Sequence, residues 1–220
     1  MTQAVLHIIS DKQRHHLPLV DALVESALGG ADVLQIRDKK SPAAETFELS
    51  QTVLTRCRQK NLKPKVLIND RVDIALALPA DGVHLAGKSL PASVVRQLRD
   101  RASWNGIIGC SIHSFDEALE AAAAGVDYIT FGHIYASESH RDVAPRGLRA
   151  LARIVEAVPL PVIAIGGIDA SNVLPVLETG VSGVAVIGAV LGSPDPRRAA
   201  LTIKEQMLKS SSKPLHPFVV

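Results

Sequence analysis

Short apolar segments alternate with longer helix-like segments along the whole chain of 220 residues. The apolar segments are rich in valine, isoleucine, leucine and alanine, and they predict eight strands at residues 5–10, 33–37, 66–69, 82–85, 107–111, 128–131, 161–165 and 183–187. The segments between them predict eight helices at residues 18–28, 42–60, 72–78, 91–101, 115–125, 148–158, 171–179 and 194–208. Ser114, with Glu117 three residues later, resembles a capping box at the start of the fifth helix.

Eight strand–helix units without a break in composition predict a single-domain TIM (β/α)8 barrel over residues 1–209. The near-continuous apolar strands fit a parallel sheet that is buried on both faces. An open doubly wound sheet is the structural alternative, but it normally has fewer repeats and a GxGxxG fingerprint after its first strand, which this chain lacks. Residues 210–220 have no helical period, and we expect a loose tail or a segment that docks on a neighbour.

Composition and charge narrow the function classes. Hydrophobic residues make up 47% of the chain, aromatic residues 3%, and the net charge is +2 without a basic stripe, so a nucleic-acid partner is not expected. No apolar run approaches the roughly 20 residues that span a bilayer, and no signal peptide is evident, so we expect no membrane partner. Cys57 and Cys110 form no metal or redox spacing, which favours a reduced, cytoplasmic setting. The sequence does not determine the oligomeric state, and a homo-oligomer is possible.

In this type of barrel the active site lies where the strands end, so we read those positions first. Gly166 and Gly167 follow the seventh strand, and Ile187 and Gly188 follow the eighth. Glycines let backbone N–H groups approach phosphate oxygens, and a helix that starts there adds a favourable dipole. These four residues predict a phosphate site, although two tight strand–helix turns would look the same.

Polar side chains follow the second and third strands. Gln35, Arg37 and Lys39 alternate with other residues and would share one face of an extended segment. The three predict a donor cluster for a carboxylate or phosphate. Solvated side chains on a loop are an equally good interpretation of Gln35, Arg37 and Lys39. Asn69 ends the third strand at the same rim.

Three histidines, His84, His113 and His133, lie at the ends of the fourth, fifth and sixth strands. They include no close-spaced ligand pair, so we expect no metal site. His113 can cap a helix, and His84 can hydrogen-bond inside the barrel. His133 follows Gly132 at the start of a long polar loop, residues 135–147, and is predicted to be the catalytic acid–base group. The loop itself resembles a lid, with an ordinary surface loop as the alternative.

Six segments together resemble the thiamine phosphate synthase/TenI family: residues 35–39, 68–73, 80–85, 109–114, 127–134 and 164–168. The resemblance covers nearly the whole chain and implies the same TIM barrel, and it implies that Asn69 is a pocket residue. The family has two main activities. Its synthases join a pyrimidine diphosphate to a thiazole phosphate with magnesium, and its TenI branch includes thiazole tautomerases.

Departures from the synthase pattern favour the tautomerase. The resemblance implies a magnesium-binding aspartate at position 70, which is present, and a second one at position 89, where this chain has Ser89. His133 stands where synthases carry proline, and Ser137-Glu138-Ser139-His140 replaces a Thr-x-Thr-Lys run. We therefore expect a metal-independent isomerase without a cofactor, which converts an alkylidene carboxythiazole phosphate into its aromatic isomer through His133. Thiamine phosphate synthase and a non-catalytic TenI-type regulator are the alternatives.

Overall fold

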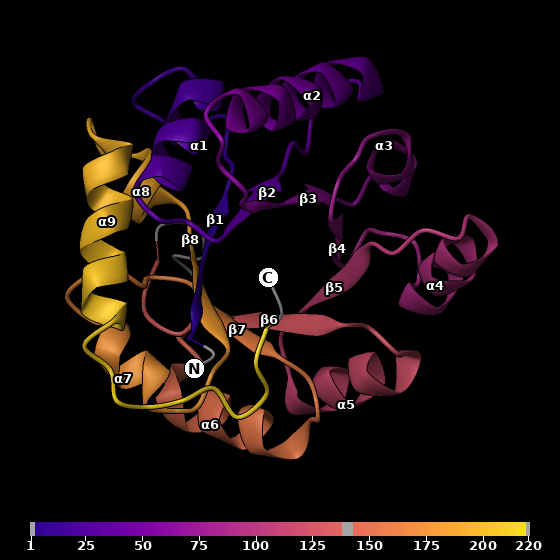
Figure 1. Ribbon diagram of the computed structural model, residues 1–220. Coiled ribbons are helices and arrows are strands. Elements are labelled where there is room, and N and C mark those ends of the chain that lie inside the picture. The colour runs from indigo at the N-terminus through magenta and orange to yellow at the C-terminus, as the bar shows by residue number, and fades with distance from the viewer. Residues whose placement is uncertain (1–2, 138–142, 219–220) are drawn as a thin grey trace.

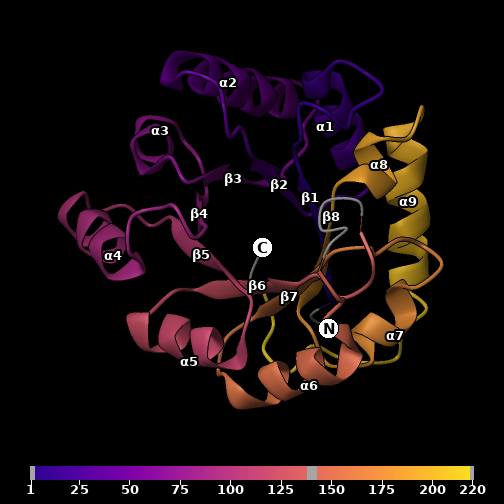
Figure 2. The same cartoon turned by 180° about the vertical axis from the view of Figure 1, so that it is seen from behind.

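The computed structural model describes residues 3–137 and 143–218. Eight parallel strands pair in chain order and close into a barrel, with helices around the outside (Figures 1 and 2). The strands are β1 Val5–Ile9, β2 Val33–Ile36, β3 Lys65–Asn69, β4 Gly82–Leu85, β5 Ile107–Ile112, β6 Tyr128–Gly132, β7 Val162–Ile165 and β8 Gly183–Val186. The predicted single-domain TIM barrel is therefore confirmed.

Each strand in the described chain is followed by helical structure, as the sequence pattern predicts. The helices are α1 Leu19–Leu28, α2 Ala43–Gln59, α3 Val72–Ala77, α4 Ala92–Arg101, α5 Phe115–Ala124, α6 Gly147–Ala157, α7 Val173–Leu177, α8 Gly188–Leu191 and α9 Pro196–Met207. The Ser114 cap is confirmed, because its side chain accepts a hydrogen bond from the Glu117 backbone N–H at 3.1 Å. Among the described residues, no helix is both long and apolar enough to cross a membrane.

Two helices differ from the predicted pattern. The helix predicted at residues 171–179 is shortened to α7, because Asp169 and Asn172 hold the preceding residues in a turn. The Asp169 backbone N–H donates to the Asn172 side chain at 2.9 Å. The four-residue helix α8, which directly follows β8, was not predicted.

The strands are apolar throughout because both of their faces are buried. In β1, Leu6 and Ile8 pack against the surrounding helices, whereas Val5 and Ile9 belong to a second cluster that fills the barrel interior. Side chains alternate between the faces of a strand, so one strand can supply both clusters. The interior cluster also contains Val33, Leu67, Tyr128, Ile163, Ala185 and Phe218.

Four residues that precede the even-numbered strands repeat one contact at the N-terminal end of the barrel. Asp32, Asp81 and Asp127 each accept a backbone N–H from the preceding odd-numbered strand, at 2.7–2.8 Å. Ser182 holds the fourth position and accepts the Val162 N–H at 3.1 Å. Unlike a carboxylate, its hydroxyl also has a proton, which it donates to the His216 carbonyl.

The prediction of a loose C-terminal tail is wrong for residues 210–218. The Leu215 N–H donates to the Gly180 carbonyl at 2.9 Å, and Phe218 is only 5% exposed. The yellow chain after α9 crosses toward the centre of the strand ring (Figure 1). The sequence pattern does not reveal this, because the segment is held by a backbone hydrogen bond and one buried apolar side chain rather than by a helix.

Candidate active site

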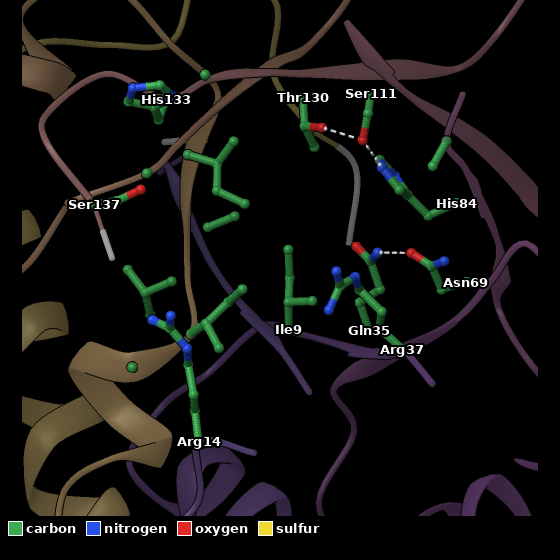
Figure 3. Close-up of a pocket in the computed structure, with 18 of the residues that line it drawn as sticks. Ile9, Arg14, Gln35, Arg37, Asn69, His84, Ser111, Thr130, His133 and Ser137 are labelled. Atoms are coloured by element: carbon green, nitrogen blue, oxygen red, sulfur yellow. Dashed lines mark hydrogen bonds between the residues drawn. The ribbon is translucent and has the colours of Figure 1, made fainter. Parts of the chain in front are cut away.

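A pocket of about 1150 Å³ opens at the C-terminal ends of the strands. It is lined by every residue for which the sequence predicts a site role: Gln35, Arg37, Lys39, Asn69, His133, Gly166, Gly167, Ile187 and Gly188. Figure 3 shows several of these side chains arranged around one space. The parallel barrel explains this convergence, because all its strands end at the same rim.

On the β2–β3 side, a chain of side-chain amides leads to a carboxylate. Gln35 Nε2 donates to Asn69 Oδ1 at 2.6 Å, and Asn69 Nδ2 donates to Asp70 Oδ2 at 2.6 Å. Asp70 has a φ of 61°, a left-handed conformation that is uncommon for residues other than glycine. Such backbone strain clusters at functional sites, which supports a functional role for this carboxylate.

Positive charge gathers beside this carboxylate. Arg37, Lys39 and Lys88 all line the pocket. The neighbouring Arg37 guanidinium lowers the pKa of Lys39, with smaller effects from burial and from Lys88. Because like charges raise each other's energy, an anion that binds between them relieves repulsion. Lys39 and Lys88 are exposed, so the interpretation as solvated charges also fits, and anion binding by these residues stays a prediction.

The backbone of Arg37 is held by the loop after β1. Its N–H donates to Ser10 Oγ at 2.6 Å, and the same hydroxyl donates to the Arg37 carbonyl at 3.0 Å. Lys12 lies 2.7 Å from Asp38 in an ion pair. Burial tends to raise the pKa of Asp38, but Lys12, Ser41 and nearby backbone N–H groups outweigh it and keep the pKa well below its usual range. These contacts orient the start of the β2–α2 loop.

A second polar network forms the floor of the pocket (Figure 3). His84 Nε2 lies 2.8 Å from Ser111 Oγ, and Thr130 Oγ1 donates to the same oxygen at 3.2 Å. His84 Nδ1 lies 2.7 Å from the hydroxyl of Tyr128, below the pocket. Burial, with a contribution from Arg37 that Asp70 opposes, lowers the pKa of His84 to about 4, so the ring is neutral at pH 7.

The glycines after β7 are required by packing. A Cβ on Gly166, where φ is 99°, would stand 2.2 Å from the Cβ of His133, and one on Gly167 would stand 2.4 Å from the carbonyl oxygen of Ala136. These glycines therefore let the β7 loop lie against the chain that leaves β6. The turn interpretation thus explains them without a ligand, and their role in phosphate binding stays a prediction.

Gly188 is different, because a Cβ there would have open space around it. The nearest atom would be Arg14 Nη1, at 4.0 Å. The expected helix dipole is small, since α8 has only four residues and α7 begins six residues after Gly167. The charge available to an anion at this end of the pocket comes instead from Arg14, which also lines it.

His133 lies at the pocket wall and is 5% exposed. Its Nε2 is 3.0 Å from the carbonyl oxygen of Val143, and its own carbonyl accepts the Arg146 N–H at 2.9 Å. The long loop is therefore attached to the end of β6 through these contacts. Residues 138–142, at the centre of the predicted lid, lie outside the described residues. The role of His133 as an acid–base group stays a prediction.

The remaining histidine, His113, also borders the pocket, and its backbone N–H donates to Glu117 Oε2 at 2.7 Å. Within residues 3–137 and 143–218 there is no group of three or more histidine, cysteine or acidic side chains arranged to hold a metal ion.

Sequence reasoning missed several pocket residues. Arg14 lies in the loop after β1, and no motif marks it. Ser111 and Thr130 follow the alternation of inward-facing positions along β5 and β6, and this signal could have identified them. Lys88 lies in the loop after β4, where only the fold shows that it approaches the pocket.

The chain is similar over almost its full length to curated thiamine-phosphate synthases. It is 38% identical to the one from Pyrococcus furiosus over 200 residues, which cover 91% of this chain and 93% of the relative. It is 40% identical to the one from Chlorobium phaeovibrioides over 209 residues, which cover 94% and 95%.

These names contradict the prediction of a TenI-type thiazole tautomerase, and they do not support an isomerase. The prediction depended on a few departures at strand ends, chiefly His133 and Ser89. Those positions are outweighed by similarity that extends through the strands, helices and loops of the whole barrel. The structure also shows His133 in contact with the Val143 carbonyl, so its presence alone does not identify a proton shuttle.

Solved structures give the same relationship. A thiamine phosphate pyrophosphorylase from Pyrococcus furiosus superimposes with a TM-score of 0.84 at 37% identity, covering 94% of this chain and 96% of that chain. A 3-hexulose-6-phosphate synthase has a TM-score of 0.69 at 18% identity and shares the fold alone. The family model described as "Thiamine monophosphate synthase" matches residues 6–190. On this similarity and on the barrel itself, the chain belongs to the thiamine monophosphate synthase family.

Proposed function

We propose that this protein is a thiamine-phosphate synthase, a transferase that joins a pyrimidine diphosphate to a thiazole phosphate with release of the diphosphate. The observation that carries the proposal is identity of 38–40% to curated synthases over at least nine-tenths of both chains. The pocket supports it independently, because its two sides suit two anionic substrates.

The two groups of residues that could bind anions lie on different parts of the pocket rim. Arg37, Lys39 and Lys88 come from the loops after β2 and β4, whereas Gly188 follows β8. In a closed barrel ordered β1 to β8, β4 lies opposite β8, whereas β2 is two strands away from β8. A reaction between two phosphorylated molecules needs such an arrangement, with the reacting atoms between the two anchors.

At the cationic end, Arg37, Lys39 and Lys88 bind the diphosphate. A leaving diphosphate develops negative charge as its bond breaks, and fixed cations stabilise that charge without having to reorganise. Arg37 is especially well placed, because Ser10 holds its backbone from both sides. At the other part of the rim, the backbone around Gly188 and the guanidinium of Arg14 bind the single phosphate of the thiazole.

The synthase reaction implies Mg²⁺, and the residues present fit a weakly held ion. Mg²⁺ is usually bound through one or two carboxylates together with water and substrate phosphates. Asp70 provides one carboxylate at the pocket, and the Ser89 hydroxyl, which donates to it, provides a neutral oxygen in place of a second. When bound, the ion neutralises charge on the diphosphate. Most of its ligands would then come from the substrate and from water.

The test is an assay for thiamine phosphate and released diphosphate with both substrates and Mg²⁺. We expect product only when all three are present, and its loss on addition of EDTA. Asp70→Asn should lower kcat/KM about a hundredfold or more, because a metal ion contributes several kcal/mol to stabilising the transition state. Asp100→Asn is the matched control, since Asp100 is exposed on α4 and neither it nor its partner Arg99 lines the pocket. Absence of product from the wild-type chain would refute the proposal.

A further inference from the structure

The chain after α9 forms the closed end of the barrel. Residues 210–218, here called the C-terminal segment, lie outside the family match, which ends at residue 190. Two contacts attach the segment: Leu215 N–H to the Gly180 carbonyl, and the Ser182 hydroxyl to the His216 carbonyl. Ser182 occupies the position where the three equivalent sites have aspartate, and aspartate as a carboxylate could not make the second contact.

Phe218 inserts into the barrel interior. It belongs to the interior cluster with Val5, Val33 and Leu67, and it meets the Tyr128 ring edge-on, with ring centroids 5.1 Å apart and an interplanar angle of 81°. This edge-to-face arrangement is a favoured geometry for aromatic pairs. Since the Tyr128 side chain is fully buried, Phe218 is part of what determines where its ring lies.

Tyr128 crosses the interior of the barrel to reach His84, two strands away. Gly109 of β5 lies between them, and a Cβ on Gly109 would stand 2.1 Å from the Tyr128 ring. The missing side chain therefore makes room for the tyrosine. The hydroxyl then lies 2.7 Å from His84 Nδ1.

The hydrogen-bond network determines the tautomer of His84. In the described part of the chain, His84 Nδ1 is the acceptor available to the Tyr128 hydroxyl, and burial raises the pKa of that hydroxyl well above its ordinary range, so it keeps its proton. A buried O–H without an acceptor is costly, so Tyr128 donates to Nδ1. The neutral ring then carries its proton on Nε2 and donates it to Ser111 Oγ, 2.8 Å away.

Ser111 connects this hydrogen-bond network to the pocket. Its oxygen accepts from both His84 and Thr130, so its own hydroxyl proton is directed to another acceptor. Ser111 lines the pocket, so this proton can be donated to a bound substrate. Figure 3 shows Ser111 and Thr130 next to one another at the pocket floor.

We propose that the C-terminal segment is a positioning element of the active site. Phe218 acts through Tyr128 to keep His84 in the Nε2–H tautomer. His84 in turn presents Ser111 to the substrate as a hydrogen-bond donor. The effect on turnover rests on the proposed function, whereas the tautomer of His84 does not.

Tyr128→Phe removes the hydroxyl and keeps the ring that Phe218 contacts. Nitrogen-15 NMR of histidine-labelled protein, with the His84 signals assigned by comparison with His84→Gln, should show one Nε2–H tautomer in the wild-type chain and a mixture in the variant. In the synthase assay we expect kcat/KM to fall about tenfold, the net value of one hydrogen bond. An unchanged tautomer in Tyr128→Phe would overturn the assignment.

Two further variants test the segment itself. Phe218→Leu loosens the aromatic contact, and Ser182→Asp restores the residue type of the three equivalent positions while it removes the donor to His216. Both should shift the His84 signals toward a mixture and lower kcat/KM. Met207→Ala is the control, because Met207 is buried in the outer core on α9 and belongs to a different cluster from Phe218.

The two readouts separate this proposal from the proposed function. Altered His84 signals in folded Phe218→Leu and Ser182→Asp, but not in Met207→Ala, support the segment's role even if the wild-type chain makes no thiamine phosphate. If both segment variants keep the wild-type signals and kcat/KM, the segment only closes the barrel and the proposal is wrong. Equal changes in Met207→Ala would also refute it.

Discussion

Two buried histidines should make this protein sensitive to mild acid. His7 and His84 are both buried inside the barrel. Burial, followed by the charge of His84, lowers the pKa of His7 from 6.5 to about 3, and burial lowers that of His84 to about 4. Below pH 6.5 the unfolded chain therefore binds protons that the folded chain does not bind. Stability contributed by neutral histidines is fully present above that pH and is lost as the pH falls toward the folded pKa values.

The size of the effect follows from the pKa difference. Each pH unit between the unfolded and folded pKa corresponds to about 1.4 kcal/mol for each group. As the pH falls from 6.5 to about 4.5, each histidine lowers the free energy of unfolding by about 2.5 kcal/mol, and the two together lower it by about 5 kcal/mol. Native domains are stable by only about 5–15 kcal/mol, so this is a large fraction.

Urea unfolding at a series of pH values, followed by circular dichroism, measures the effect. His7→Leu should reduce the loss between neutral pH and about pH 4.5 by about 2.5 kcal/mol, because the group that titrates is gone. Leucine fills this buried position without a group that titrates, and it removes only the interaction with Gln35, which acts against burial by raising the pKa of His7. His16→Gln, at an exposed position, is the control. If His7→Leu loses as much stability in acid as the wild type, the reasoning from burial is wrong.

Three other changes give distinct outcomes. Gly109→Ala should lower the free energy of unfolding by about 1–3 kcal/mol through overpacking, because the new Cβ would stand 2.1 Å from the Tyr128 ring. Thermal melting measures this effect, and an unchanged Tm would contradict the prediction. Gly166→Ala should also destabilise the fold, whereas Gly188→Ala should leave the Tm unchanged and raise the KM for thiazole phosphate, since its Cβ enters open pocket space. Ser89→Asp should lower the Mg²⁺ concentration for half-maximal synthase activity by about tenfold, because affinity rises with carboxylate number; no shift in that titration would indicate that the ion does not bind at this position.

The site was partly visible in the sequence. Gln35, Arg37, Lys39 and Asn69 lie at or just after the ends of predicted strands, and the closed barrel brings those strand ends to one rim. The functional branch that His133 and Ser89 predict is wrong, because similarity to thiamine-phosphate synthases extends along the whole chain. A single side chain at a strand end can serve several chemistries, so its identity alone does not specify the reaction.

The sequence by itself determined the order and type of the elements and, through them, the barrel. The signals for these elements are local: runs of apolar residues, a capping serine and terminal glycines. Local signals can be read directly from the sequence, because the residues that form them are neighbours along the chain. Only the tertiary structure decided that Arg14 faces Gly188, that Tyr128 reaches His84 across Gly109, and that Phe218 closes the interior. Each of these contacts joins residues that are distant along the chain, and no local pattern specifies which distant partner a buried side chain will meet.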